Sequence, residues 1–154
     1  MQIGTETVAL VTGGASGLGG AVTRMLAGQG ARVAVLDMDA EKGAAMAEET
    51  GARFQPTDVG DAESVRRALD AVEAELGTPR ICVNCAGIGP AAKTVSKEAP
   101  HDAALFEKVI RVNQLGTFHT ASQAAARMAA LDPDGPDGER GVIVNTASVA
   151  AYEG

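Results

Sequence analysis

Residues 12–20 read Thr12-Gly13-Gly14-Ala15-Ser16-Gly17-Leu18-Gly19-Gly20, and they separate a predicted buried strand, Thr7–Thr12, from a predicted helix, Leu18–Gln29. The glycines at 13, 17 and 19 permit a tight turn, a close approach of the backbone to a pyrophosphate, and close packing of helix on strand. Free N–H groups at the helix N-terminus favour a bound phosphate, to which the Ser16 hydroxyl can also donate. A glycine-rich turn can simply connect two elements, but this position between strand and helix favours a dinucleotide site. We therefore predict cofactor contacts at Gly13, Ser16, Gly17 and Gly19.

The rest of the chain alternates short apolar runs with helical patterns. Strands of continuous Val, Ile and Leu between helices are typical of a parallel sheet covered on both faces. We predict an α/β, Rossmann-type doubly wound parallel sheet of about five strands, in one NAD-binding domain over residues 1–154. Further strands are predicted at Arg32–Asp37, Arg53–Pro56, Pro79–Asn84 and Gly141–Thr146, and further helices at Ala40–Thr50, from the cap Asp61 to Leu76, and from about Asp102 to Met128. Polar loops are predicted at Gly87–Pro100 and Asp132–Gly138.

The second predicted strand ends at Asp37, 24 residues after Gly13. A carboxylate at this place can accept hydrogen bonds from the adenosine ribose hydroxyls and would repel the 2′-phosphate of NADP. The following Met38-Asp39 offers no cation to offset that repulsion. The pattern therefore predicts NAD as the cofactor, although an Asp that only caps the next helix is the alternative.

The composition excludes several classes of protein. With 45% hydrophobic and 21% charged residues, the chain is expected to fold. Its net charge is −7, and it has no run of basic residues that would bind nucleic-acid phosphates. The sequence has no stretch of 18 apolar residues that would predict a membrane helix. Its first residues do not resemble a signal peptide, so a cytoplasmic location is expected. His101 and His119 lack acidic or cysteine partners at ligand spacing, and no metal site is predicted.

The two cysteines, Cys82 and Cys85, have the spacing of a redox or zinc pair. A reactive pair needs its first cysteine near a helix N-terminus, whereas Ile81-Cys82-Val83-Asn84-Cys85 indicates the end of a buried strand. We therefore predict two buried, unreactive thiols.

Four motifs in this order resemble those of the short-chain dehydrogenase/reductase family. They are Thr12-Gly13-x-x-x-Gly17-x-Gly19, Asn84-Cys85-Ala86-Gly87, Asn113 in the long predicted helix, and Val144-Asn145-Thr146-Ala147-Ser148. Within the family the chain most resembles the type-2 3-hydroxyacyl-CoA dehydrogenases, because of the cysteine inside the second motif, Lys93-Thr94, and the Thr-Ala before Ser148.

The resemblance implies roles for particular residues. Asp58 would accept from the adenine amino group and Val59 would offer its backbone, whereas the alternatives are a simple cap before Gly60 and a simple core residue. Ser148 would bind the substrate oxygen, and Asn113 would distort its helix and support a water linked to a catalytic lysine. The implied cofactor contacts are completed by Leu18, Asn84, Cys85, Ala86 and Gly87.

The family's reaction is hydride transfer between NAD and a secondary alcohol or ketone, with proton transfer by the tyrosine of a Tyr-x-x-x-Lys motif. The sequence ends six residues after Ser148, and its one tyrosine, Tyr152, has no lysine behind it. We therefore expect a fragment, or one of two chains, that is inactive alone, with a non-catalytic dinucleotide-binding module as the alternative.

The substrate expected from the resemblance is a 3-hydroxyacyl-CoA, with a 3-oxoacyl carrier-protein thioester or a small polyol as alternatives. Lys93, Lys97 and His101 could contact CoA phosphates, although a solvated loop explains them as well. The resemblance further implies a homotetramer that uses the long helix, whose apolar face is Leu105, Phe106, Val109, Ile110 and Val112.

Overall fold

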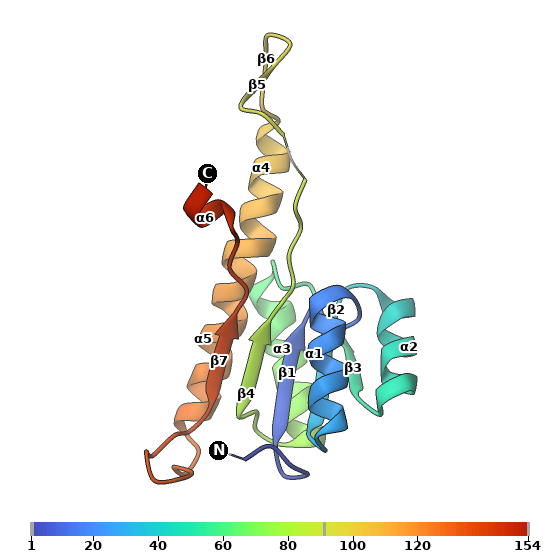
Figure 1. Cartoon of the computed structure of the whole chain (residues 1–154), viewed down its shortest axis with the longest axis vertical. Coiled ribbons are helices and arrows are strands. Elements are labelled where there is room, and N and C mark those ends of the chain that lie inside the picture. The colour runs from blue at the N-terminus through green and yellow to red at the C-terminus, as the bar shows by residue number, and fades with distance from the viewer. Residues whose placement is uncertain (1, 91, 154) are drawn as a thin grey trace.

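The computed structural model describes residues 2–90 and 92–153 and contains a five-stranded parallel sheet. Its strand order is β3-β2-β1-β4-β7, and every neighbouring pair is parallel (Figure 1). The predicted Rossmann-type sheet is therefore confirmed. The strands are β1 (Val8–Thr12), β2 (Arg32–Asp37), β3 (Arg53–Pro56), β4 (Ile81–Asn84) and β7 (Val142–Asn145).

Helices cover both faces of this sheet, as the uninterrupted apolar strands predict. Helices α1 (Gly17–Gly28) and α2 (Ala40–Thr50) pack on one face, and α3 (Ala62–Leu76) and α5 (Gly116–Ala129) pack on the other. Alternate residues of β1 accordingly enter different cores: Val8 and Leu10 pack with α3 and α5, whereas Ala9 and Val11 pack with α1 and α2.

Capping residues set the ends of these helices. Asp61 accepts from the Glu63 N–H at 3.0 Å and begins α3, while Gly51 ends α2 in the left-handed region at φ 73°. The strand order reverses at β1, because β2 and β3 lie on one side of it and β4 and β7 on the other. In an open parallel sheet, the crevice at the carboxyl ends of the strands beside such a reversal is the usual ligand site.

Two expectations about the second half of the chain need correction. The region Gly87–Pro100, predicted as a loop, contains a short hairpin of β5 (Val95–Ser96) and β6 (Ala99–Pro100). Ala91 in this region lies outside the described residues. Lys97 and Glu98 at its tip adopt φ 48° and 66°, and Figure 1 shows the hairpin standing away from the sheet.

The predicted single long helix is the second correction, because it divides into three parts. They are α4 (Ala103–Ile110), the π-helical turn η1 (Arg111–Leu115) and α5. The chain ends in the short helix α6 (Ala150–Glu153). None of the described helices is both long enough and apolar enough to span a membrane.

Candidate functional site

A cleft of about 430 Å³ opens at the carboxyl ends of β1, β2, β3 and β4. It brings together all the residues predicted to contact a cofactor except Asn84. Sequence analysis missed five further residues of its wall, of which one lies in β2, three follow β2, β3 or β4, and one comes from η1. The lining residues are Gly13, Ser16, Gly17, Leu18, Gly19, Asp37, Asp58, Val59, Cys85, Ala86 and Gly87, with Leu36, Met38, Thr57, Ile88 and Val112 as the additions.

The glycine turn depends on having no side chains at two positions. Gly13 has φ 63°, and a Cβ there would lie 2.8 Å from the Ala86 Cα. A Cβ on Gly19 would overlap the Gly13 carbonyl oxygen. Ser16 caps α1, but its hydroxyl makes no hydrogen bond to the helix. The turn therefore keeps an open helix N-terminus with an exposed hydroxyl beside it, as anion binding requires.

Asp37 lies at the end of β2, where its carboxylate is shared between two backbone donors. Oδ2 accepts from the Ala15 N–H at 3.1 Å, and Oδ1 accepts from the Asp39 N–H at 3.0 Å. Each carboxylate oxygen has a second lone pair, so the group can still accept from a ribose. The carboxylate also joins β2 directly to the glycine turn.

A cation lies closer to this region than sequence analysis suggested. Lys42 Nζ is 2.7 Å from Asp39 Oδ2, and this hydrogen bond raises the pKa of Lys42 and lowers that of Asp39. Asp39 is the N-cap of α2 and Lys42 follows three residues later, and this spacing in the sequence could have identified the pair. Because Asp39 already holds the ammonium, Lys42 does not neutralise the Asp37 carboxylate by a direct ion pair.

The turn after β3 contains Asp58 and Val59. Asp58 Oδ1 accepts from the Gly60 N–H at 2.9 Å, as the capping interpretation predicts, and the half-buried carboxylate also lines the cleft. Val59 is only 5% exposed and packs in the core, yet it too borders the cleft. Both residues therefore have the structural role and also border the cleft.

The segment after β4 is held to β1 through Thr12. Thr12 Oγ1 accepts from the N–H groups of Cys85 and Ala86, both at 3.1 Å. The Asn84 amide donates to Asn145 Oδ1 at 2.9 Å and does not line the cleft. Asn84 therefore joins β4 to β7 behind the site.

The two thiols differ in their surroundings. Cys82 is fully buried, and burial raises its pKa to about 12, in agreement with an unreactive thiol. Cys85 lies beyond the end of β4, is half-buried and lines the cleft, so the prediction that both thiols are buried is wrong for Cys85. The extended strand ends one residue too early to carry it into the core.

Asn113 lies in the π-helical turn η1 and forms hydrogen bonds with the segment that follows Gly87. Its Oδ1 accepts from the Ile88 N–H and its Nδ2 donates to the Ile88 carbonyl, both at 2.9 Å. Ser148 is exposed beyond β7, where its Oγ accepts from the Ala150 N–H at 3.2 Å. Neither residue lines the cleft, and Tyr152 is 92% exposed.

Among the described residues, no group of three or more His, Cys, Asp or Glu side chains could hold a metal ion.

Comparison with known proteins gives consistent matches along the chain. A family model described as short chain dehydrogenase matches residues 7–154. The 3-hydroxyacyl-CoA dehydrogenase type-2 of Drosophila melanogaster is 45% identical over 153 residues, covering 97% of this chain and 60% of that protein. The D-threitol dehydrogenase of Mycolicibacterium smegmatis is 39% identical over 149 residues, covering 94% of this chain and 53% of that protein.

A solved structure, the 3-hydroxyacyl-CoA dehydrogenase type-2 of Mycobacterium avium, is 39% identical with a TM-score of 0.89. The match covers 99% of this chain and 61% of that one. The chain therefore spans about 60% of the length of the first relatives it matches.

Proposed function

The chain belongs to the short-chain dehydrogenase family, and we propose that it forms the cofactor-binding part of an NAD-dependent oxidoreductase. In this proposal, hydride passes between NAD and a secondary alcohol or ketone, most readily a 3-hydroxyacyl-CoA. The observation that carries the proposal is the cleft that contains the glycine turn and the Asp37 carboxylate together.

The residues of the cleft fit a dinucleotide in three places. The close approaches at Gly13 and Gly19 hold the turn in a shape that a Cβ would disrupt, and the α1 N-terminus and the Ser16 hydroxyl favour a pyrophosphate beside it. Asp37 would accept from the ribose, and Asp58 from the adenine amino group. Leu18 and Met38, 72% and 69% exposed, would cover the apolar faces of the adenosine.

NAD supplies the hydride acceptor for the reaction, and the chain's own residues orient the partners. Ser148 would donate to the substrate oxygen and hold it near the cofactor. Asn113 would keep the Ile88 backbone in place through its paired hydrogen bonds and so shape the inner end of the cleft. We propose that the proton-transfer tyrosine and lysine lie outside these 154 residues and that the chain alone does not turn over.

The acyl-CoA assignment is supported by the similarity to 3-hydroxyacyl-CoA dehydrogenases and by the exposed Lys93 and Lys97. A small polyol is the second candidate substrate, because a D-threitol dehydrogenase is also a relative. Exposed apolar side chains on α4, η1 and α5 favour a homotetramer that covers this surface. They are Phe106, Leu115 and Phe118.

Calorimetric titration of the full-length protein with NAD and NADP tests the cofactor. We expect tighter binding of NAD; tighter binding of NADP would overturn the argument from Asp37, and no binding of either would overturn the proposed function. Formation of NADH with 3-hydroxybutyryl-CoA or with threitol then separates the substrates. Replacement of Lys93 and Lys97 by Ala should raise KM for the acyl-CoA, and an unchanged KM removes them from the site.

A further inference from the structure

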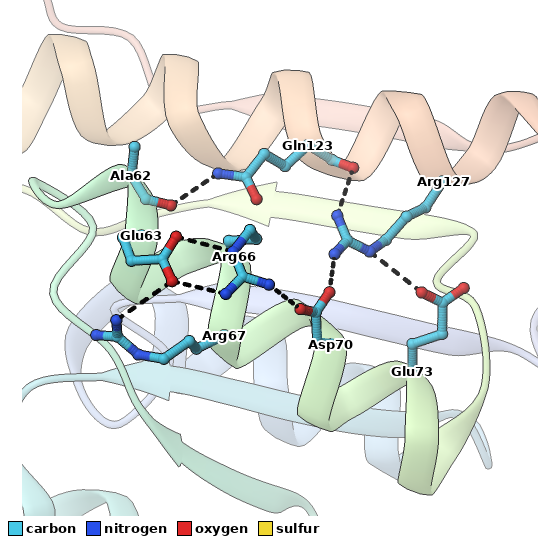
Figure 2. A network of polar contacts seen from close by, with 8 residues as sticks. All are labelled: Ala62, Glu63, Arg66, Arg67, Asp70, Glu73, Gln123 and Arg127. Atoms are coloured by element: carbon cyan, nitrogen blue, oxygen red, sulfur yellow. Dashed lines mark hydrogen bonds and ion pairs between the residues drawn. The ribbon is translucent and has the colours of Figure 1, made fainter.

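The turn Asp58–Asp61, on the side of the cleft proposed for adenine, is contacted by one face of helix α5. Gly116 is the first contact, because a Cβ there would lie 2.7 Å from Val59 Cγ2. His119 follows three residues later, with its Nδ1 3.0 Å from the Val59 carbonyl oxygen. One helical turn further on, Gln123 donates at 2.9 Å to the carbonyl of Ala62, which lies outside Asp58–Asp61 at the start of α3 (Figure 2). The spacing of three and four residues places all three on the same side of the helix.

The contact made by His119 has a defined chemical direction. A carbonyl oxygen only accepts, so Nδ1 must carry the proton, whichever form the rest of the ring takes. His119 is half-buried, and its partner Val59 is 5% exposed. The hydrogen bond is therefore largely shielded from competing water.

This hydrogen bond holds one side of a peptide group whose other side is held by Asp58. The Val59 carbonyl and the Gly60 N–H belong to the same planar peptide unit. His119 donates to the carbonyl, and Asp58 Oδ1 accepts from the N–H at 2.9 Å. Rotation of this peptide would break both bonds, so the orientation of the Asp58 carboxylate depends on the His119 ring. A donor on the carbonyl also strengthens the hydrogen bond from the N–H by polarising the amide.

Val59, which lines the cleft, has one further polar group. Its N–H has no hydrogen-bond partner among the described residues, although the side chain is packed in the core. A nucleobase edge with an acceptor beside an exocyclic amine would match an unpaired N–H beside a carboxylate. Both groups are set by the peptides that flank Val59.

We propose that His119 is a positioning residue for the adenine end of the cofactor, acting through the Val59–Gly60 peptide. This inference rests on the proposed binding of NAD. It assigns a binding role to α5, a helix that does not itself line the cleft. A role in general packing would instead affect all ligands and the fold alike.

The test compares variants of equal size with and without the donor. His119→Asn keeps an amide N–H near the place of Nδ1, and His119→Leu has the same shape without it. Gln123→Leu is the matched control, since it removes the neighbouring bond from the same helix to Ala62. The measurement is the dissociation constant of the full-length protein for NAD, ADP-ribose and nicotinamide mononucleotide.

We expect His119→Leu to raise the dissociation constants for NAD and ADP-ribose about 3- to 10-fold. The dissociation constant for nicotinamide mononucleotide should stay unchanged. His119→Asn should restore wild-type binding, and Gln123→Leu should lower the unfolding midpoint without weakening ADP-ribose. His119→Ala is the second donor-free variant if His119→Leu does not fold. Equal binding by wild type and the donor-free variant, or no recovery by His119→Asn, overturns the inference alone. Wild-type protein that binds none of the probes overturns the proposed function as well.

Discussion

Asp37 Oδ2 accepts a hydrogen bond from the Ala15 N–H at 3.1 Å, so the end of β2 is tied to the glycine turn across 22 residues of chain. The carboxylate that is proposed to select NAD is thus also part of the turn that would hold the pyrophosphate. Substitutions chosen to change cofactor preference will therefore act on two parts of the site at once.

Replacing Asp37 should separate charge from hydrogen bonding. Asp37→Asn keeps one carbonyl acceptor but removes the negative charge, so the ratio of NADP to NAD affinity should rise. Asp37→Ala also loses the acceptors for Ala15 and Asp39, and it should weaken NAD by a further factor of about 10. Titration of both variants with both cofactors checks this. An affinity ratio that stays at the wild-type value in Asp37→Asn would show that charge does not set the preference.

Gly19 and Gly28 lie on the same helix and offer a matched pair. A Cβ at Gly19 would overlap the Gly13 carbonyl, whereas a Cβ at Gly28 has nothing within 4 Å. Gly19→Ala should lower the free energy of unfolding by about 1–3 kcal/mol and abolish NAD binding. Gly28→Ala should raise it by up to about 1 kcal/mol and leave binding unchanged. Urea denaturation and calorimetry measure both effects, and normal NAD binding by Gly19→Ala would contradict the need for a close approach at Gly19.

The sequence was sufficient to predict the sheet and most of the cleft, because those features follow from local patterns. A few neighbouring residues are enough to identify each of these features, which are the apolar strands, the capping Asp61 and Gly51, and the glycine turn. Parallel strands place their following loops at one edge of the sheet, and that rule alone brings Gly13, Asp37, Asp58 and Cys85 together.

The features that sequence analysis missed depend on contacts between distant segments. Nothing near Asn113 identifies Ile88 as its partner, and nothing near His119 identifies Val59. The hairpin tip at Lys97-Glu98 has no Gly or Asn, the residues by which a left-handed turn is recognised. Cys85 was assigned to the core because the end of an apolar strand cannot be placed to within one residue.

The thiols should differ in reactivity. Cys82 is buried and protonated well above neutral pH, so iodoacetamide should modify it only after unfolding, whereas the half-buried Cys85 should react in the native protein. Bound NAD should slow the modification of Cys85, because this residue lines the cleft. Mass spectrometry of alkylated peptides with and without NAD checks this. Faster labelling of Cys82 than of Cys85 in the native protein would contradict the burial argument.

Cys82 also predicts a dependence of stability on alkaline pH. Its pKa is raised from 9.0 to about 12 in the folded state, so the folded state binds the thiol proton more tightly than the unfolded state. This contribution is complete below pH 9.0 and is lost as the pH rises toward about 12. Relative to Cys82→Ala, the wild-type advantage in free energy of unfolding should shrink above pH 9.0. A difference that is constant across this range would argue against the raised pKa.

Arg127 should be the ion-pairing residue whose loss affects stability most, because it joins two helices from a largely buried position. Its side chain is 17% exposed and pairs with Asp70 and, at 3.2 Å, with Glu73 of α3, while Nη1 donates to the Gln123 carbonyl (Figure 2). Removing the guanidinium leaves the two carboxylates without this partner. Arg127→Met should therefore lower the free energy of unfolding by about 1–3 kcal/mol.

Arg24→Met is the control for that substitution. Arg24 pairs with Glu49 at 2.6 Å, but both side chains are about half exposed, so water and salt replace much of what the pair contributes. The Arg24 variant should have nearly the wild-type midpoint in urea, and its small difference should vanish in high salt. The loss caused by Arg127→Met should be less sensitive to salt, because the Arg127 side chain is only 17% exposed where α5 packs on α3. Equal effects of the two substitutions would mean that the Arg127 cluster is an ordinary surface network.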